Sequence, residues 1–496
     1  MNDAEFRTIF KKLTRNAPLS WQERLFRDHF SVKKNIPSVI DLPTGLGKTM
    51  VMAIWLIARA ANETLPRRLI YVVDRRTVVD QATALATKLQ RRVKALHRLA
   101  RRQPDLEPFC KSFPVPAIST LRGQLADNRE WSRNPSRPAI IIGTVDLIGS
   151  ALLFSGYRSS YKRRPLDAGL LGQDSLLVLD EAHLSRPFER LLGSIGGFNK
   201  ACANSISTGK PMRVIRMSAT SSSSTDSTID VFRLEGDFDS RTGDFADDTV
   251  RNRYKATKHV RITQLDGNEG LTNKLASEAI KLAQDNMLRG KRIVVFVRKP
   301  EDAKAVAKAV REHVAESVGE LGSKPNKIKN APYVNSVEVL TGTMRGLERD
   351  KLVEKPVLKR FLDGGENPDI VENKTRVFLI STSAGEVGFD LNADHMVCDA
   401  TTLDSLVQRL GRVNRRGWGD ATIVLVREPV KMKDGKPVEL KGLDLAIANT
   451  LQLIEDVIDV SPNNIIDVSP KNIALLKLGE WKVKYAASCS PDVSTV

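Results

Sequence analysis

Apolar and polar residues follow one another along the chain in a pattern that predicts parallel β-sheets covered by helices. Short apolar runs that end at a turn are followed by longer segments with apolar residues at helical spacing, and this order is typical of βαβ units. Two sets of strands are predicted. They cover 38–41, 69–73, 139–142, 176–180 and 214–217, and then 292–297, 337–340, 376–380, 395–399 and 422–426. We therefore expect two copies of one α/β architecture.

A polar segment at 221–254 separates the two sets. It contains a run of four serines and many Asp and Gly residues, and such a composition cannot build a core. The predicted division is a first domain at 1–230, a linker at 231–255, a second domain at 256–430 and a C-terminal extension at 431–496.

Three further segments have distinctive patterns. Residues 91–138, rich in Arg and Pro, are interpreted as an insertion, whereas 301–318 has the spacing of a packed helix. The octapeptide 458–465 is repeated almost unchanged at 466–473. One local duplication is too short for a solenoid, so we interpret it as a replicated surface loop or turn.

Composition narrows the class of protein. The chain has 496 residues and a net charge of +18, which favours a polyanionic partner but does not separate DNA from RNA. Its four cysteines form no CxxC pair, so neither a disulfide framework nor a zinc knuckle is suggested. The longest nearly apolar stretch, 139–154, is shorter than the roughly 20 residues of a membrane helix, and no secretory signal is apparent. The sequence therefore predicts a cytoplasmic protein without a membrane span.

The strongest candidate for chemistry is Asp41-Leu42-Pro43-Thr44-Gly45-Leu46-Gly47-Lys48-Thr49, between a predicted strand and an apolar helix at 50–60. A glycine turn that opens a helix presents N–H groups to phosphate, while Lys48 can neutralise the β- and γ-phosphates of ATP and Thr49 can bind Mg²⁺. Leu42 replaces the usual first glycine, and this Pro-Thr-Gly-x-Gly-Lys-Thr form is the one that superfamily 2 helicases use. The residues assigned to the nucleotide here are Thr44, Gly45, Gly47, Lys48 and Thr49.

A second motif is Leu176-Leu177-Val178-Leu179-Asp180-Glu181-Ala182-His183, an apolar strand that ends in two carboxylates. A buried parallel strand delivers its last residues to the carboxyl edge of the sheet, where ligands bind. Asp180 would hold Mg²⁺, and Glu181 would orient and activate the attacking water. His183 is open to two interpretations: it couples ATP to the nucleic-acid track, or it caps a local hydrogen bond. The Asp-Glu-Ala-His order is that of a DEAH box.

The predicted second domain contains Asp404-Ser405-Leu406-Val407-Gln408-Arg409-Leu410-Gly411-Arg412-Val413-Asn414-Arg415-Arg416-Gly417. Arginines three apart on one helical face can present two guanidinium groups to the γ-phosphate, the role of an arginine finger. By position Arg412 and Arg415 are the candidates, and Arg409 is interpreted as structural. An Arg-rich helix is otherwise often a nucleic-acid surface.

Two more segments resemble helicase motifs that link the nucleotide to the nucleic acid. Met217-Ser218-Ala219-Thr220 follows a strand and resembles the segment that couples hydrolysis to domain closure. Ser381-Thr382-Ser383-Ala384-Gly385-Glu386-Val387-Gly388-Phe389-Asp390 resembles the motif that contacts both ligands. There Thr382 would reach a nucleic-acid phosphate, and Gly388 and Asp390 the nucleotide. The residues assigned to coupling are His183, Ser218, Thr220 and Gln408.

Shorter segments predict contacts to adenine and to nucleic acid. Pro18-Leu19-Ser20-Trp21-Gln22 resembles the adenine-reading glutamine motif, with Gln22 able to make two hydrogen bonds to adenine. Segments 71–81, 143–146 and 340–345 fall where helicases contact backbone phosphates, and such contacts give affinity without reading sequence. Alternatively, the arginines among them are ordinary surface residues. The residues assigned to nucleic acid are Arg75, Thr144, Asp146, Arg345 and Thr382.

Together, residues 21–417 resemble the helicase portion of the type I CRISPR-associated helicase-nuclease. The narrower resemblance lies in 71–81, 142–157 and 407–417, the last ending in Gly-Arg-Val-Asn-Arg-Arg-Gly. This resemblance implies two RecA-like parallel-sheet P-loop domains in tandem, with ATP in the cleft between them. It also implies a 3′ to 5′ translocase on single-stranded DNA, which an RNA-guided CRISPR surveillance complex recruits to unwind target DNA in antiviral defence.

The chain also departs from that family, which normally pairs the motor with an HD nuclease. None of its six histidines is followed by Asp, and no second metal cluster can be assembled. We therefore expect no nuclease activity from this chain, and either a separate HD nuclease as partner or a truncated or split chain. The C-terminal extension is also expected to be truncated.

The leading hypothesis is a nucleic-acid-stimulated ATPase and DNA helicase in which Glu181 directs water onto the γ-phosphate, while Arg412 and Arg415 stabilise the developing charge. One alternative is an RNA helicase of the same superfamily, which shares every ATP motif. The other is a docking subunit that hydrolyses ATP but does not unwind.

Overall fold

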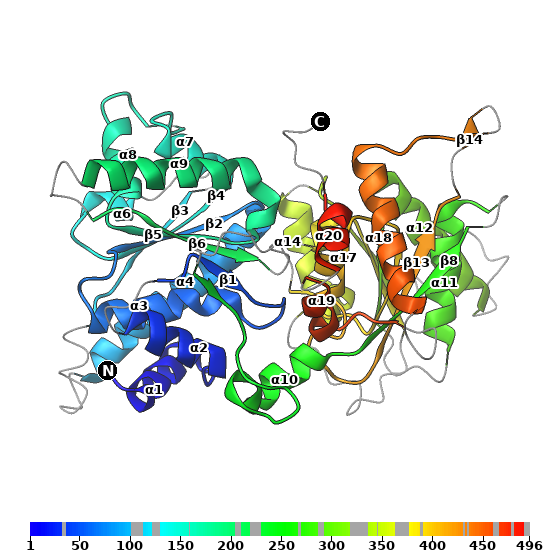
Figure 1. The fold of residues 1–496 in the computed structure, drawn as a ribbon, viewed down its shortest axis with the longest axis horizontal. Helices are drawn as coiled ribbons and strands as arrows, with labels where there is room; N and C mark the ends of the chain where they lie inside the picture. The colour runs from blue at the N-terminus through cyan, green and yellow to red at the C-terminus, as the bar shows by residue number, and fades with distance from the viewer. Residues whose placement is uncertain are drawn as a thin grey trace. The chain divides into compact units, whose positions relative to one another are not determined.

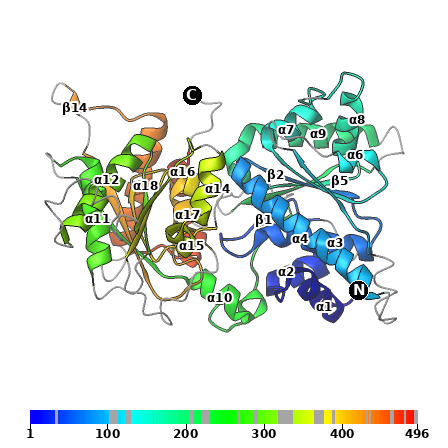
Figure 2. The ribbon, with the colours of Figure 1, turned by 180° about the vertical axis from the view of Figure 1, so that it is seen from behind.

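The chain forms two compact α/β units, Met1–Arg251 and Asn252–Val496, in the computed structural model, shown in Figures 1 and 2. Each unit is built on a parallel sheet, which confirms the predicted fold class. Every predicted strand is present within two residues of its expected ends. The structure describes residues 1–31, 36–100, 113–121, 129–157, 159–203, 210–218, 230–265, 269–285, 292–317, 336–344, 346–362, 376–386, 390–429, 432–433, 436–459, 466–477 and 481–490.

The sheet of the first unit has the strand order β3-β4-β2-β5-β6-β1-β7, and all neighbouring strands are parallel. Because Val73 pairs with Thr144 and Asp41 with Ser218, the carboxyl ends of these strands align along one edge. The strands are β1 (Val39–Asp41), β2 (Arg68–Val73), β3 (Ala117–Leu121), β4 (Ala139–Thr144), β5 (Ser175–Leu179), β6 (Arg213–Ser218) and β7 (Val231–Phe232).

Helices cover both faces of this sheet, which is why its strands are apolar on both sides. One face carries α1 (Asp3–Thr14), α2 (Ser20–Leu25), α3 (Val51–Ala61) and α4 (Arg76–Ala100), and the other carries α6 (Glu130–Arg133), α7 (Val145–Leu152), α8 (Arg164–Gly172) and α9 (Arg186–Ala203) (Figure 1). The shorter elements of this region are the π-helix η1 (Phe26–Phe30), the 3₁₀ helices η2 (Lys48–Met50), η4 (Ala182–Ser185) and η5 (Gly243–Ala246), and α10 (Asp248–Lys255).

Two segments are more structured than the sequence predicts. The interpretation of 91–138 as an insertion is wrong for its described parts, because α4 continues to Ala100 and β3 forms an edge strand of the sheet. Val93, Leu96 and Ala100 are buried at helical spacing, but the basic residues between them obscure this period in the sequence. Within the expected linker 231–255, β7 pairs with β1 and so extends the first sheet.

The sheet of the second unit has the order β10-β11-β9-β12-β13-β8-β16. All neighbours are parallel except β16, which pairs antiparallel with β8. The strands are β8 (Lys258–Gln264), β9 (Arg292–Phe296), β10 (Val337–Leu340), β11 (Val377–Ser381), β12 (His395–Asp399), β13 (Ala421–Arg427) and β16 (Ile466–Asp467), beside a small hairpin of β14 (Met432–Lys433) and β15 (Lys436–Pro437).

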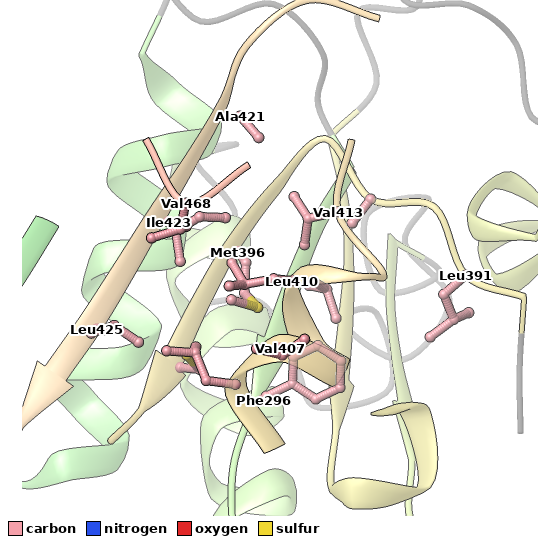
Figure 3. Close-up of a cluster of buried hydrophobic side chains, with 14 of the residues drawn as sticks. Phe296, Leu391, Met396, Val407, Leu410, Val413, Ala421, Ile423, Leu425 and Val468 are labelled. Carbon is pink, nitrogen blue, oxygen red and sulfur yellow. The ribbon is translucent and has the colours of Figure 1, made fainter. Parts of the chain in front are cut away.

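Alternation along the strands divides the core of the second unit into two layers. In β9, Ile293 and Val295 pack with α11 (Leu271–Gln284) and α12 (Pro300–Ser317). Val294 and Phe296 point to the opposite layer, part of which Figure 3 shows around Met396 and Leu410. That layer is covered by α14 (Gly346–Glu354), α15 (Pro356–Phe361), α17 (Leu403–Leu410), α18 (Gly442–Asp459), α19 (Pro470–Leu476) and α20 (Lys482–Ser488), while α16 (Ser383–Glu386) follows β11.

The second copy of the duplicated octapeptide is part of this fold. Its first residues form β16, and Asp467 accepts hydrogen bonds from the backbone N–H of Lys258 at 3.0 Å and of Ser469 at 2.9 Å. Val468 and Ser469 are buried. The interpretation as a surface loop is therefore wrong for this copy, because it pairs with the sheet and caps α19. Of the first copy, 458–465, only the first two residues lie within the described part of the chain, at the end of α18. None of the described helices is both long and apolar enough to cross a membrane.

Candidate functional site

The predicted site residues of the first unit gather at the carboxyl edge of its sheet. Thr144 is the last residue of β4, Ser218 is the last of β6, and Asp180 directly follows β5. The glycine-rich loop follows β1 at the same edge. Because parallel strands end together here, the sheet brings together four motifs that are far apart in the sequence.

The glycine-rich loop has the backbone of a phosphate-binding loop. Gly45 and Gly47 have φ angles of +87° and +72°, a region that side chains with a Cβ rarely adopt. Lys48–Met50 follow as a 3₁₀ turn that leads into α3, so backbone N–H groups at a helix start are available to an anion. Lys48 is buried, and its Nζ donates to the carbonyl of Leu42 at 3.3 Å.

A chain of contacts links three of the motifs. The Nζ of Lys48 lies 3.7 Å from Oε1 of Glu181, and Oε2 of Glu181 lies 3.6 Å from Nδ1 of His183. The Nδ1 of His183 in turn lies 3.1 Å from Oγ of Ser218, within hydrogen-bonding distance. Glu181 itself has a left-handed backbone, with φ at +47°. The tertiary fold therefore joins the P-loop, the acidic motif and the segment that follows β6.

The carboxylate of Asp180 is held by a residue to which the sequence assigned no such role. The hydroxyl of Tyr71 donates to Oδ2 of Asp180 at 2.6 Å, and it also interacts with the side chain of Thr49. Segment 71–81 was predicted to contact nucleic acid, but Tyr71 is buried in β2 and turned towards the acidic motif. The available signal was a tyrosine within an aliphatic strand, because a buried hydroxyl needs a partner.

This geometry fits a magnesium site. Thr49 and Asp180 both interact with Tyr71, and their side chains offer oxygen ligands, which Mg²⁺ prefers. Burial, reinforced by the charge of Glu181, raises the pKa of Asp180 to about 6. Because removing a proton from this carboxyl is costly, a cation beside it would favour the ionised form.

The glutamine expected to read adenine packs against the P-loop. Gln22 is buried, its Oε1 accepts from the backbone N–H of Leu19 at 2.9 Å, and its Nε2 donates to the carbonyl of Gly47 at 3.4 Å. The indole N–H of Trp21 donates to the carbonyl of Leu46 at 3.1 Å. Both residues therefore support the loop directly, and the contact of Gln22 with adenine stays a prediction.

The residues assigned to nucleic acid in the first unit have different environments. Arg75 is partly buried, with its Nε 3.9 Å from Asp74. Thr144 is buried at the start of α7, whereas Asp146 is exposed in the first turn of that helix. Thr144 ends β4, and Arg75 and Asp146 lie two residues beyond the ends of β2 and β4, so all three are at the sheet edge that carries the P-loop.

In the second unit, Arg409 has a structural environment, as its position suggested. It is fully buried and donates to Oε1 of Glu386 and to Oδ1 of Asp399, both at 2.8 Å. Burial opposes the charged form, but the charges of Glu386 and Asp399 outweigh it and raise the pKa of the guanidinium. This residue therefore ties α17 to the end of α16 and to the end of β12. Gln408 beside it is also buried.

The two candidate arginine fingers converge, although not as expected. The sequence predicts that they share one helical face, but α17 ends at Leu410, and Arg412 and Arg415 lie in the turn that follows. That turn brings Arg415 to 2.8 Å and Arg412 to 3.8 Å from Oδ1 of Asp390. Burial alone would raise the pKa of Asp390, but the charge and hydrogen bond of Arg415 and the charge of Arg412 hold it below its usual value.

The remaining assigned residues are described only in part. Thr382 is buried after β11, and its Oγ1 accepts from the backbone N–H of Gly342 at 3.4 Å. Thr220, Arg345 and Gly388 lie outside the described residues. Among the residues that the structure does describe, no group of three or more His, Cys, Asp or Glu side chains is arranged to hold a metal ion.

Comparisons with known proteins agree with this arrangement. Residues 10–223 match the family model described as the res subunit of the type III restriction enzyme, and residues 289–417 match the one described as the C-terminal part of the CRISPR-associated nuclease/helicase Cas3. No curated protein matches the sequence significantly.

Solved helicase structures share the fold at low sequence identity. T. fusca Cas3 with AMPPNP is 14% identical, with a TM-score of 0.56 over 97% of this chain and 55% of that one. The DUF1998 helicase MrfA bound to DNA and AMPPNP is 16% identical, with a TM-score of 0.53 over 85% and 50%. Mycobacterium smegmatis helicase Lhr bound to ssDNA and AMP-PNP is 16% identical, with a TM-score of 0.50 over 91% and 52%. The chain thus spans about half the length of these structures.

Proposed function

We propose that this chain, a superfamily 2 helicase whose second unit carries the Cas3-like helicase segment, hydrolyses ATP to move along single-stranded DNA. One observation carries the proposal. Lys48, Glu181, His183 and Ser218 form a continuous chain of contacts at the carboxyl edge of the first sheet. These contacts connect Lys48, which is assigned to phosphate, with Ser218, which is assigned to coupling hydrolysis to domain closure.

Each side chain has a chemical role in this proposal. Lys48 and the N–H groups of the P-loop bind the phosphates, and Glu181 orients and deprotonates the attacking water. Thr49 and Asp180 would hold Mg²⁺, which supplies charge stabilisation at the phosphoryl oxygens. Arg412 and Arg415 stabilise the negative charge that develops on the transferred group. Arg412 and Arg415 both contact Oδ1 of Asp390, so in this proposal they exchange that partner for the γ-phosphate.

Single-stranded DNA is the proposed track. The net charge of +18 favours a polyanion, and the Lhr and MrfA structures that share the fold hold ssDNA and DNA. Thr144 and Asp146 of the first unit and Thr382 of the second are the proposed backbone contacts among the described residues. Arg75 joins them, although its contact with Asp74 must then open or be shared.

The match to the Cas3 model supports a more specific role. We assign the chain to unwinding of target DNA with 3′ to 5′ polarity in CRISPR antiviral defence, after recruitment by an RNA-guided surveillance complex. Cutting of the strand would be done by a nuclease centre other than the ATP site described above. A docking role without unwinding is the competing function, because ATP hydrolysis does not by itself require strand separation.

ATPase and strand-displacement assays on the same preparations test the proposal. We expect single-stranded DNA to stimulate hydrolysis, Lys48→Ala to abolish it, and Glu181→Gln to bind ATP while turnover falls about 10²- to 10⁴-fold, as expected for loss of a general base. Glu63→Gln, which alters an exposed carboxylate outside the site, is the matched control. Full DNA-stimulated turnover in either variant would contradict the assigned roles.

The choice of track and polarity needs substrates of defined form. Duplexes with a 3′ or a 5′ single-stranded DNA tail, and the same pair with RNA tails, separate the alternatives. Displacement from the 3′-tailed DNA alone supports the proposal, whereas displacement from RNA tails indicates the RNA helicase. ATPase without displacement on any substrate indicates the docking subunit.

A further inference from the structure

We infer that the described residues of 153–166 in the first unit form a second binding surface for single-stranded DNA, in addition to the residues assigned above to backbone phosphates; this inference rests on the proposed function. The surface, called here the aromatic–basic patch, consists of the loop between α7 and α8 and the start of α8. Phe154 is 57% exposed, Tyr157 68% and Tyr161 85%. No other aromatic side chain in the described part of the chain is as exposed as these three.

The backbone at Phe154 is strained in a way that packing does not explain. Helix α7 ends with the N–H of Phe154 bonded to the carbonyl of Ala151 at 3.2 Å, and the N–H of Ser155 bonded to the carbonyl of Ser150 at 2.8 Å. This is the Schellman pattern, in which the residue at the position of Phe154 is usually glycine. Phe154 has φ at +58°, which is unfavourable for a bulky side chain. Since its ring is exposed, burial does not offset the strain, and strain of this kind indicates a functional constraint.

The rest of the loop is held in place by side-chain contacts. The hydroxyl of Ser159 donates to Oδ2 of Asp167 at 2.6 Å. Arg163 donates to Oγ of Ser132 at 2.6 Å and lies 3.3 Å from Oδ1 of Asp167. Along the chain, Ser159 and Arg163 flank Tyr161 and follow Tyr157. The ring of Tyr161 is therefore presented between two anchored residues, which reduces the entropy lost when a ligand binds.

The chemistry of the patch matches single-stranded DNA. Exposed rings on which bases stack, combined with positive charge along the backbone, are the two features of proteins that bind single strands without reading sequence. The described residues of 153–166 include three basic residues, Lys162, Arg163 and Arg164, and no acidic residue. Lys162 is exposed beside Tyr161, whereas Arg163 is partly neutralised by Asp167. Bases of a duplex are already stacked on each other, so rings on an open surface favour a single strand.

The location of the patch continues the proposed track. Thr144 and Asp146, which we assign to backbone phosphates, lie at the start of α7, and the patch begins at the end of that helix. An eight-residue helix is about 12 Å long. A strand that leaves the sheet edge along α7 would therefore reach Phe154 within a few nucleotides. In this position the patch adds affinity for the strand without contacting ATP.

Binding to single-stranded DNA tests the inference. In the full chain, we expect the double substitution Tyr157→Ala and Tyr161→Ala to raise the Kd for a fluorescent oligothymidylate at least about tenfold, since one stacked base contributes roughly that factor. The DNA concentration for half-maximal ATPase stimulation should rise in parallel, while kcat at saturating DNA is unchanged. Tyr157→Phe with Tyr161→Phe keeps both rings and should bind as the native chain does.

Phe154→Gly separates loss of DNA binding from loss of folding. Glycine relieves the backbone strain, so this variant should have a higher Tm and yet bind DNA more weakly. A Kd unchanged by removal of the rings would overturn the inference and indicate that the patch has another occupant, such as a protein partner. An oligouridylate bound more tightly than the DNA, with the same loss in the variants, would overturn the choice of DNA.

The inference and the proposed function can fail separately. If Lys48→Ala abolishes DNA-stimulated ATPase while the ring variants bind DNA normally, the proposed ATPase function is supported and the DNA-binding role of the aromatic–basic patch is refuted. If the native chain hydrolyses no ATP but the ring variants lose DNA binding, the aromatic–basic patch is supported as a DNA-binding surface and the proposed ATPase function is refuted.

Discussion

Replacement of Tyr71 by phenylalanine removes one hydroxyl group from the interior of the first unit. That hydroxyl donates to Oδ2 of Asp180 at 2.6 Å and interacts with Thr49, the two residues that we assign to Mg²⁺. The phenyl ring keeps the volume of the side chain, so the packing of β2 is retained. Any effect should therefore come from the orientation and charge of the two ligands.

The size of the effect follows from the bond that is lost. A hydrogen bond to a charged group contributes roughly 1.5–3 kcal/mol, and 1.36 kcal/mol corresponds to about tenfold in an equilibrium constant. We therefore expect Mg²⁺ affinity to fall about 10- to 100-fold, the range seen when residues that orient metal ligands are removed. The hydroxyl also lowers the pKa of Asp180 against the effect of burial, so its loss should move the acidic limb of the activity profile to higher pH.

A Mg²⁺ titration of ATPase activity at fixed nucleotide and DNA measures this effect. The concentration of Mg²⁺ at half-maximal rate should rise in Tyr71→Phe, and excess Mg²⁺ should restore most of kcat. Tyr485→Phe, which removes a hydroxyl from a buried tyrosine of the second unit, is the control and should titrate as the native chain does. An unchanged midpoint in Tyr71→Phe would refute the positioning role, and a loss of kcat that Mg²⁺ cannot restore would place Tyr71 elsewhere in the mechanism.

Substitutions at three other sites, Asp180, the Arg409–Glu386 pair and Phe154, have expected outcomes. In the native chain without Mg²⁺, stability should fall as pH rises from 4 to 7, because the pKa of Asp180 is about 6 when folded against 3.8 as its ordinary value, a difference of at most about 3 kcal/mol. Asp180→Asn should abolish this dependence and be the more stable form at pH 8, as urea unfolding in EDTA would show. Arg409→Met leaves Glu386 buried without its cation and should destabilise the second unit by about 3–5 kcal/mol. Adding Glu386→Gln should recover part of that loss, and no recovery would contradict the assigned pairing. Phe154→Gly should stabilise the first unit by about 1–2 kcal/mol, and a lower Tm would show that the ring packs against something.

Local patterns predicted the elements well because parallel strands buried on both faces are continuous apolar runs. Every strand expected from such a run is present. Where a strand is very short or contains charged residues, the hydrophobic pattern is weak, and this explains why the sequence does not predict β8 and β16. Lys258 begins β8 with a buried side chain, and β16 has only two residues. Their place in the sheets depends on pairing with distant strands, which hydrophobic periodicity does not report.

The sequence by itself determined the P-loop, the acidic motif and the arginine-rich motif, since each depends on residues at fixed short spacing. The resemblance to the CRISPR-associated helicase was also evident at this level, and the family match to 289–417 confirms it. Only the tertiary structure placed the hydroxyl of Tyr71 on Asp180, joined Lys48 to Glu181, and turned Arg412 and Arg415 towards Asp390 beyond the end of α17. Those contacts join residues of different strands and turns, and they exist because parallel strands end at one edge and the chain changes direction there.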